Sequence, residues 1–89
     1  MNMHYVYIIR SLKTGKLYKG YSKNLKGRVK EHNSRKNAST KNGAPWKLIY
    51  YAVFSNKTDA LREEKFLKSG KGKERLKFLL KETSKSKIN

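Results

Sequence analysis

The sequence predicts a small α+β domain whose elements follow the order ββαβαα. The chain has 89 residues and no cysteine, so one core held together by apolar packing has to suffice. Three runs rich in β-branched and aromatic residues have the composition of strands, and elsewhere apolar residues recur at the three- and four-residue spacings of helices. We assign residues 1–82 to this single domain and expect residues 83–89 to form a flexible tail.

The first two strands are expected to pair as a hairpin. The run HYVYIIR at residues 4–10 is apolar on both of its alternating faces, which predicts a strand covered on both sides. A turn containing glycine follows, and LYKGYS at residues 17–22 resumes the strand pattern. Tyr7 and Tyr18 therefore lie on adjacent strands. Gly20 marks either a bulge or a place where backbone or ligand approaches closely.

A helix is predicted from residue 24 onward, with Ser22 or Asn24 as its N-cap. Arg28 and His32 are one helical turn apart, so both can point toward the sheet. Arg28 could instead be a solvated charge on a basic helix, and His32 a packing or capping residue. One face of this helix repeats at spacings of four and three, at Leu25, Val29 and His32.

Residues 34–46 contain Gly, Pro, Asn and Ser without periodicity, so we expect an exposed basic loop. KLIYYAVF at residues 47–54 is the third predicted strand. A helix follows over SNKTDALREEKFLK, capped by Asn56 or Thr58. Its inner stripe is predicted to contain Ala60, Leu61 and Leu67. After breaks at the glycines at positions 70 and 72, a last helix is predicted to turn Leu76, Leu79 and Leu80 inward.

Glu64 has a position that conflicts with its chemistry. Helical spacing places it within the apolar stripe of its helix, whereas Glu63 lies toward the edge. An ionised carboxylate in such a place needs a cation or hydrogen-bond donors. One interpretation is a salt bridge with a Lys or Arg, and the other is a metal ligand, because one carboxylate with waters and a substrate phosphate suffices for Mg²⁺.

The charge balance points to an anionic partner. Lysine and arginine number 23 against 6 acidic residues, a formal net charge of +17. The basic residues are spread along the chain, which favours nucleic acid over a membrane or an acidic protein, although a merely solvated basic surface is the alternative. So few carboxylates argue against a carboxylate-rich two-metal site. We find no long apolar run, and we expect a cytoplasmic protein that does not bind membranes.

Taken in order, four stretches resemble the GIY-YIG nuclease domain. The resemblance is closest to its small stand-alone members, which are described as related to the nuclease domain of the excision-repair incision subunit. It covers roughly residues 4–80 and departs from the family's pattern at Tyr5, Lys19 and Tyr21. The family fold, a small antiparallel three-stranded sheet flanked by helices, agrees with the predicted element order. The stretches are YVY at 5–7, LYKGYS at 17–22, NLKGRVKEHN at 24–33 and ALREEKFLKSGKGKERL at 60–76.

The resemblance implies hydrolysis of a phosphodiester with one Mg²⁺ or Mn²⁺ ion. Tyr7, or alternatively Tyr18, would deprotonate or orient the attacking water, although a phenol with a pKa near 10 is a poor base unless cations favour the phenolate. Arg28 would stabilise the transition state, His32 would assist by hydrogen bonding, and Glu64 would hold the metal. Gly20 is the family's structural glycine. The lysines expected to bind the nucleic-acid backbone are Lys13, Lys16, Lys19, Lys41, Lys71, Lys73 and Lys77.

Three functions are compatible with these patterns. The leading one is a metal-dependent endonuclease that acts on DNA in preference to RNA, with structure preference or low sequence specificity. The second is a nucleic-acid-binding module that keeps the fold without cleaving. Retention of the tyrosines, Arg28 and Glu64 argues against it, because binding alone requires no carboxylate on the inner face of a helix. The third is a small RNA-binding protein of ribosomal type. The sequence does not identify any protein that would recruit so small a domain.

Overall fold

The computed structural model describes residues 2–85, and its centre is a three-stranded antiparallel sheet. The strands are β1 (His4–Ser11), β2 (Leu17–Ser22) and β3 (Trp46–Phe54), in the spatial order β2-β1-β3. The hairpin of β1 and β2 is the one that the sequence predicts. β1 is the central strand, so its side chains are covered on both faces, and the predicted fold class is confirmed.

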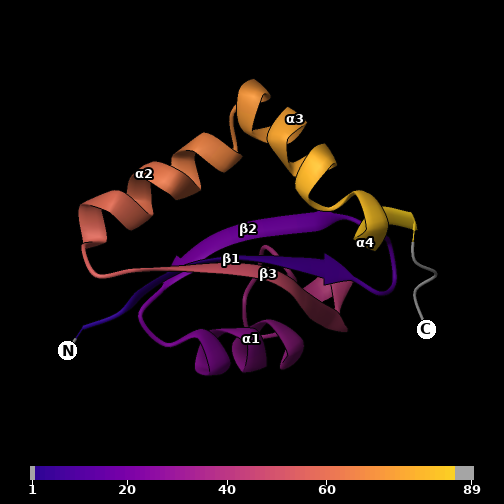
Figure 1. Ribbon diagram of the computed structural model, residues 1–89. Helices are drawn as coiled ribbons and strands as arrows, with labels where there is room; N and C mark the ends of the chain where they lie inside the picture. The colour runs from indigo at the N-terminus through magenta and orange to yellow at the C-terminus, as the bar shows by residue number, and fades with distance from the viewer. Residues whose placement is uncertain (1, 86–89) are drawn as a thin grey trace.

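Helices cover the two faces of the sheet unequally. Figure 1 shows α1 (Leu25–Asn33) against one face, with α2 (Lys57–Leu67) and α3 (Gly70–Leu79) over the other. A short helix, α4 (Lys81–Lys85), continues from α3. None of the helices among the described residues is long and apolar enough to cross a membrane. The sheet therefore separates two small cores, one beneath α1 and one beneath the C-terminal helices.

The alternation of β1 divides its side chains between these two cores. Val6 and Ile8 pack against α2 and α3, whereas Tyr7 and Ile9 face α1. Burial of such side chains stabilises the fold by roughly 1.5–3 kcal/mol each. The partners are Ala60, Leu67, Leu76 and Leu80 on the first side, and Ala44 and Trp46 on the second.

Two asparagines fix where the helices begin. The Asn24 side chain accepts a hydrogen bond from the backbone N–H of Gly27, so Asn24 caps α1 and Ser22 does not. In the same way Asn56, not Thr58, caps α2, because its side-chain oxygen accepts the N–H groups at the start of that helix. Each cap contributes about 1 kcal/mol and sets the phase of the helix that follows.

The prediction of an exposed loop over residues 34–46 is wrong for its second half. Thr40 and Ala44 are buried, Trp46 is buried at the start of β3, and Lys41–Gly43 form a single turn of 3-10 helix. The indole N–H of Trp46 donates to the backbone carbonyl of Thr40 at 2.8 Å, which folds the segment inward. Composition is a poor guide here because the lysines point outward while the small residues between them complete the core.

Leu61 and Leu79 were expected to face inward, but both are exposed. The helices bury a narrower stripe than predicted, since Ala60 and Leu67 on α2, and Leu76 and Leu80 at α3, already fill the contact with the sheet.

We expected the glycines at positions 70 and 72 to precede the last helix as breaks. Both lie within that helix, because α3 begins at Gly70, directly after its N-cap Ser69. Gly72 is buried where a Cβ atom would collide with the backbone of Phe66, so it allows α3 to pack on the end of α2. The expected tail begins later than residue 83, because Thr83 lies in α4 and its carbonyl accepts a hydrogen bond from Arg10 at 3.2 Å. The rest of that tail, residues 86–89, lies outside the described residues.

Candidate active site

Gly20 permits the Tyr7 ring to cross strand β2. Tyr7 is the register partner of Gly20, and a Cβ atom on Gly20 would lie 2.5 Å from the Tyr7 hydroxyl. The pairing of β1 with β2 is regular, and the one register shift in the sheet falls between β1 and β3. The bulge interpretation of Gly20 is therefore wrong, and the group that approaches Gly20 closely is the Tyr7 side chain, whereas we expected backbone or a ligand.

The Tyr7 hydroxyl begins a buried chain of hydrogen bonds. It lies 2.8 Å from Nε2 of His32, and Nδ1 of His32 lies 2.7 Å from the hydroxyl of Thr40. All three side chains are essentially inaccessible to solvent. We call Tyr7, His32 and Thr40 the phenol–imidazole chain. Both ring nitrogens of His32 are satisfied, so the imidazole is held in one orientation.

Tyr18 lies beside this chain without joining it. Its register partner is Ile9, so it shares a face with Tyr7 and sits diagonally to it, not directly opposite. The Tyr18 ring is 5.0 Å from the His32 ring and 6.4 Å from the Trp46 ring, centroid to centroid. Tyr18 is only partly buried, so its position is suited to meeting a ligand or substrate at the surface of the site.

Burial sets the protonation of the phenol–imidazole chain. It raises the pKa of Tyr7 above the ordinary value; Tyr18, Glu64 and Glu31 add to this effect, and Arg28 opposes it. The cations that we expected to favour a phenolate are thus outweighed by desolvation. Burial, followed by Arg28, also lowers the pKa of His32, while Glu31 acts in the opposite direction. At neutral pH the pair is a neutral phenol beside a neutral imidazole that can accept a proton.

Arg28 and Glu64 form the charged part of the site, and we call them the charged pair. Each pairs with a residue one turn away along the chain: Nη1 of Arg28 lies 3.1 Å from Glu31, and a carboxylate oxygen of Glu64 lies 3.3 Å from Nζ of Lys68, the C-cap residue of α2. Their side chains are 39% and 21% exposed, respectively. Both act on the Tyr7 phenol electrostatically, from α1 and from α2. The predicted salt bridge of Glu64 is therefore present. It is partly exposed to solvent, which weakens the attraction between the two charges.

Glu63 is not more peripheral than Glu64, contrary to our expectation. Its side chain is 18% exposed and pairs with Arg75 at 2.9 Å. The two glutamates differ instead in direction. Glu63 lines a cleft with Phe54 and Phe66, whereas Glu64 acts on Tyr7. Glu64 and Glu63 are thus buried to a similar extent, and the groups that surround their carboxylates distinguish the candidate metal ligand from its neighbour.

The donor atoms near Glu64 suit one kind of metal site only. Among residues 2–85, no group of three or more His, Asp or Glu side chains could hold an ion. A cage built from protein ligands alone is therefore not available in this part of the chain. Mg²⁺ is commonly held by one or two carboxylates with waters and substrate phosphates. The half-buried carboxylate of Glu64 fits an ion of that kind, shared with a substrate.

The seven lysines predicted to bind nucleic acid are not gathered in one place. Lys19, Lys73 and Lys77 line a cleft between β2 and α3, whereas Lys13 and Lys41 line another near the turn of the hairpin. Burial, with the ammonium groups of Lys73 and Lys68, lowers the pKa of Lys19, so these cations lie near one another on the α2 side. Lys16 and Lys71 are exposed and line neither cleft.

Thr40 is the member of the site that the sequence did not reveal. It lies in an irregular segment, where no periodicity indicates which residues turn inward. Its burial depends on Trp46, which binds the Thr40 carbonyl. The available signal was the isolated tryptophan after a Gly-Ala-Pro turn, because so large an apolar ring has to pack against something.

A comparison with protein-family models identifies the class of protein that this fold and site define. The model described as the GIY-YIG catalytic domain matches residues 3–77, a span that contains all five predicted catalytic residues. The match covers most of the chain, so the protein belongs to the GIY-YIG family. This is a family of nuclease domains that act on nucleic acid and generally depend on a divalent metal ion.

The particular relatives are small stand-alone proteins of one group. A UPF0213 protein of Staphylococcus haemolyticus is 39% identical over 80 residues, which cover 89% of this chain and 96% of that protein. A UPF0213 protein of Bacillus licheniformis is 43% identical over 77 residues, covering 83% of this chain and 78% of that protein. The solution NMR structure of a UPF0213 protein from Bacillus halodurans is 38% identical, covers 86% of this chain and 84% of that chain, and has a TM-score of 0.53. The sequence resemblance and the predicted fold are thereby confirmed.

Proposed function

We propose that the protein is a metal-dependent endonuclease that hydrolyses phosphodiester bonds, acting on DNA in preference to RNA and using one Mg²⁺ or Mn²⁺ ion. One observation carries the proposal. A buried phenol bonded to a neutral imidazole lies within the electrostatic influence of both an arginine and a half-buried glutamate. A module that only binds nucleic acid has no use for the glutamate, because a carboxylate repels phosphate.

The phenol–imidazole chain supplies the path for a proton. Tyr7 is buried in the free protein, so the attacking water has to reach its oxygen together with the substrate. The Tyr7 oxygen then accepts a proton from this water while its own proton moves to Nε2 of His32, 2.8 Å away. No free phenolate is needed, which agrees with the raised pKa of Tyr7. Thr40 accepts a hydrogen bond from Nδ1 and holds His32 in the tautomer that leaves Nε2 free to receive the proton. Tyr7 is therefore the proposed water-activating residue, and Tyr18 orients the water or the substrate.

The charged pair handles the phosphate. Arg28 exchanges its bond to Glu31 for a bidentate contact with the scissile phosphate and stabilises the charge that develops there. Glu64 is the residue that would hold the metal ion, in exchange for Lys68 and together with the substrate. When bound, such an ion neutralises charge on the phosphate and on the leaving oxygen. The lysine clefts bind the backbone without reading sequence, so specificity arises from the shape of the substrate.

The test is a nicking assay on duplex, single-stranded, flap, four-way-junction and RNA substrates. Each substrate is incubated with Mg²⁺, with Mn²⁺ or with chelator, and wild-type protein is compared with Glu64→Ala. We expect products that need the metal, are lost in the variant and are most abundant on a DNA substrate. Equal binding without cleavage by either protein would overturn the proposal in favour of a binding module. Preference for RNA would reject the choice of DNA.

A further inference from the structure

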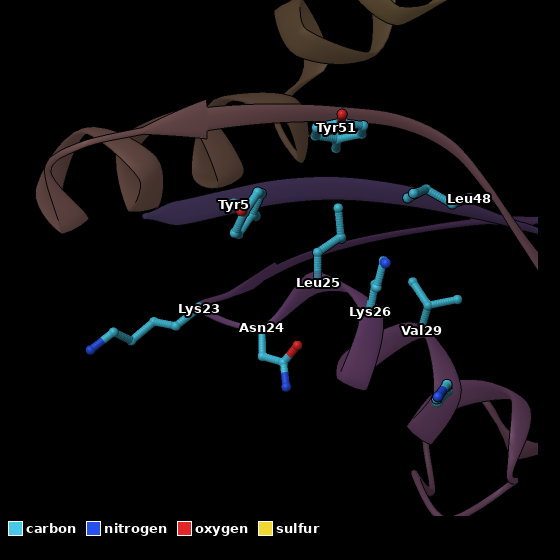
Figure 2. A pocket seen from close by; sticks show the side chains of 9 residues that line it. Tyr5, Lys23, Asn24, Leu25, Lys26, Val29, Leu48 and Tyr51 are labelled. Carbon is cyan, nitrogen blue, oxygen red and sulfur yellow. The ribbon is translucent and has the colours of Figure 1, made fainter. Parts of the chain in front are cut away.

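A groove that the proposed mechanism does not use opens between α1 and the sheet. Its volume is about 630 Å³, within the roughly 300–1,000 Å³ of sites that hold small organic ligands. Figure 2 shows Tyr5 of β1 and Tyr51 of β3 on one side, facing Leu25 and Lys26 of α1 on the other. The groove is hollowed beside Tyr5, two residues before Tyr7 on the same strand and the same face.

The aromatic wall of the groove is open to solvent. The rings of Tyr5 and Tyr51 are 6.3 Å apart between centroids and tilted by 56°. The Tyr51 residue is 53% exposed, although it lies in a strand at the level of the buried Tyr7. β3 is an edge strand, and its exposed Tyr51 leaves an aromatic surface beside α1. Such surfaces are where unstacked nucleobases bind, because every base offers a flat face to stack on.

The rim of the groove is basic. Lys23, Lys26 and Lys30 line it, and its lining contains no carboxylate. This arrangement favours an anion with an apolar, flat portion. It disfavours a second copy of the chain, because two molecules with a net charge of +17 repel one another. A nucleotide has both features, a stacking base and a phosphate.

We propose that this groove binds an unpaired nucleotide of a single-stranded nucleic-acid segment, with the base against Tyr51 and the neighbouring phosphates on Lys26 and Lys30. The inference rests on the proposed function in one respect: it identifies the substrate of the nuclease as a nucleic acid with an unpaired segment near the cleavage point. Tyr5 and Tyr7 are about 7 Å apart along β1. The Tyr7 ring crosses β2 while Tyr51 lies on β3, so the groove and the Tyr7 hydroxyl lie on opposite sides of β1, and a strand that occupies both has to cross β1. The groove thus provides a physical basis for structure preference without base-specific hydrogen bonds.

The experiment measures binding in the presence of chelator, so it does not depend on cleavage. Full-length protein is titrated into a single-stranded DNA oligonucleotide that contains the fluorescent base 2-aminopurine, and into a matched oligonucleotide with abasic positions. Wild-type protein is expected to quench the fluorescence and to bind the abasic strand more weakly. We expect Tyr51→Ala to lower affinity about 5- to 100-fold and to abolish the quenching, and Tyr51→Phe to retain both. Tyr51 is exposed, so its replacement leaves the buried core unchanged, and circular dichroism checks that each variant is folded.

A second pair of variants tests the basic rim. The double variant Lys26→Gln and Lys30→Gln removes two charges at the groove, and Lys57→Gln with Lys65→Gln removes two from exposed positions on α2. The groove variant should lower the slope of log affinity against log salt by about 1.4, since each phosphate contact on a single strand contributes about 0.7. The α2 variant should leave that slope near the wild-type value.

Three outcomes would overturn the inference. They are equal affinity for the intact and abasic strands, unchanged binding by Tyr51→Ala, and a dimer in sedimentation that Tyr51→Ala converts to monomer, which would assign the groove to a second copy. The proposed function can fail separately: base-dependent binding by a protein that cleaves nothing would leave the groove as assigned and remove the nuclease.

Discussion

The two halves of the candidate site differ in how firmly the fold holds them. The phenol–imidazole chain is dry, and each of its polar atoms bonds to another buried group of the chain. The charged pair is partly solvated, and each member bonds to a flexible side chain one turn away along the chain. Surface pairs of this kind are worth about 0–1 kcal/mol, whereas an unsatisfied buried polar group costs about 1–3 kcal/mol.

This difference indicates which part of the site is built before substrate arrives. Proton transfer needs fixed distances and a defined tautomer, and burial provides both. Binding of phosphate and metal needs groups that can change partners, and a weak ion pair within one helix gives them up at little cost. Substitutions in the phenol–imidazole chain should therefore affect stability and cleavage together, and substitutions in the charged pair should affect cleavage alone.

Glu64→Ala should have the largest effect on cleavage. We expect metal-dependent cleavage to fall by at least about 10³-fold, because the carboxylate that acts on Tyr7 from α2, and that is proposed to hold the metal, is lost. The melting temperature and low-salt DNA binding should stay near wild type, since the Lys68 pair is solvated. Glu63→Ala is the matched control, equally buried but paired with Arg75. Equal loss of activity in both variants would contradict the assignment of Glu64, and not Glu63, to the active site.

Tyr7→Phe and Tyr18→Phe compare a member of the phenol–imidazole chain with its neighbour. Tyr7→Phe should lower the cleavage rate about 10²- to 10⁴-fold and lower the free energy of unfolding by about 1–3 kcal/mol, because Nε2 of His32 loses its buried partner. Tyr18→Phe should cost less in both quantities. Single-turnover rates and chemical denaturation measure them. A larger rate loss for Tyr18→Phe would make Tyr18 the water-activating residue.

Arg28→Lys tests the fork of the guanidinium in the charged pair. A lysine keeps the charge and can still pair with Glu31, but it cannot hold a phosphate bidentately. We expect about a 10²-fold loss of cleavage with little change in the thermal melt. Rates measured at saturating substrate distinguish a slower cleavage step from weaker binding of the substrate. Wild-type activity in the variant would count against the bidentate contact.

Gly20→Ala displaces the phenol–imidazole chain without changing any of its members. The new methyl group would lie 2.5 Å from the Tyr7 hydroxyl, so the ring has to move away from His32. Overpacking of this kind costs about 1–3 kcal/mol in the free energy of unfolding, and cleavage should fall with it. Gly70→Ala is the control, because a Cβ atom there meets nothing within 4 Å. A stable, fully active Gly20→Ala variant would show that Tyr7 is not positioned by this contact.

The regular elements of the fold were predictable from the sequence, and the irregular ones were not. The two-faced apolar pattern of residues 4–10 predicted a central strand, and Asn24 and Asn56 were among the predicted caps. Leu61 was assigned to the wrong face because a stripe of one-turn spacing does not reveal how wide the contact is. The buried part of residues 34–46 was missed because a segment without periodicity gives no direction to its side chains.

The same contrast holds for the site. Tyr7, Arg28, His32 and Glu64 lie on regular elements, and helical or strand spacing was enough to select three of them. Spacing could not rank Tyr7 above Tyr18, because that difference depends on the cross-strand register and on Gly20. The role of Thr40 depends on a contact between distant segments, and no local rule contains it.

The smallest expected effect is a dependence of stability on pH that originates in His32. Burial lowers the pKa of His32, so the folded protein keeps the imidazole neutral where the unfolded chain begins to bind a proton, below about pH 6.5. The free energy of unfolding decreases with falling pH wherever the unfolded state binds more protons than the folded state. The melting temperature should therefore decrease as the pH is lowered from 7.5 to 5.5 at constant ionic strength.

His32→Gln should reduce this decrease, because it removes the group that titrates differently in the two states. The variant starts from a lower stability, since the glutamine cannot reproduce both hydrogen bonds of the imidazole, so the comparison is the slope against pH and not the absolute melting temperature. His4→Gln controls for the loss of an imidazole elsewhere in the protein. An unchanged slope in His32→Gln would mean that the imidazole takes up its proton over the same pH range in the folded and unfolded states, which contradicts the lowered pKa of His32. A slope that becomes steeper in the variant would mean that the folded protein holds the imidazole charged, and Nε2 would then be unable to accept the Tyr7 proton.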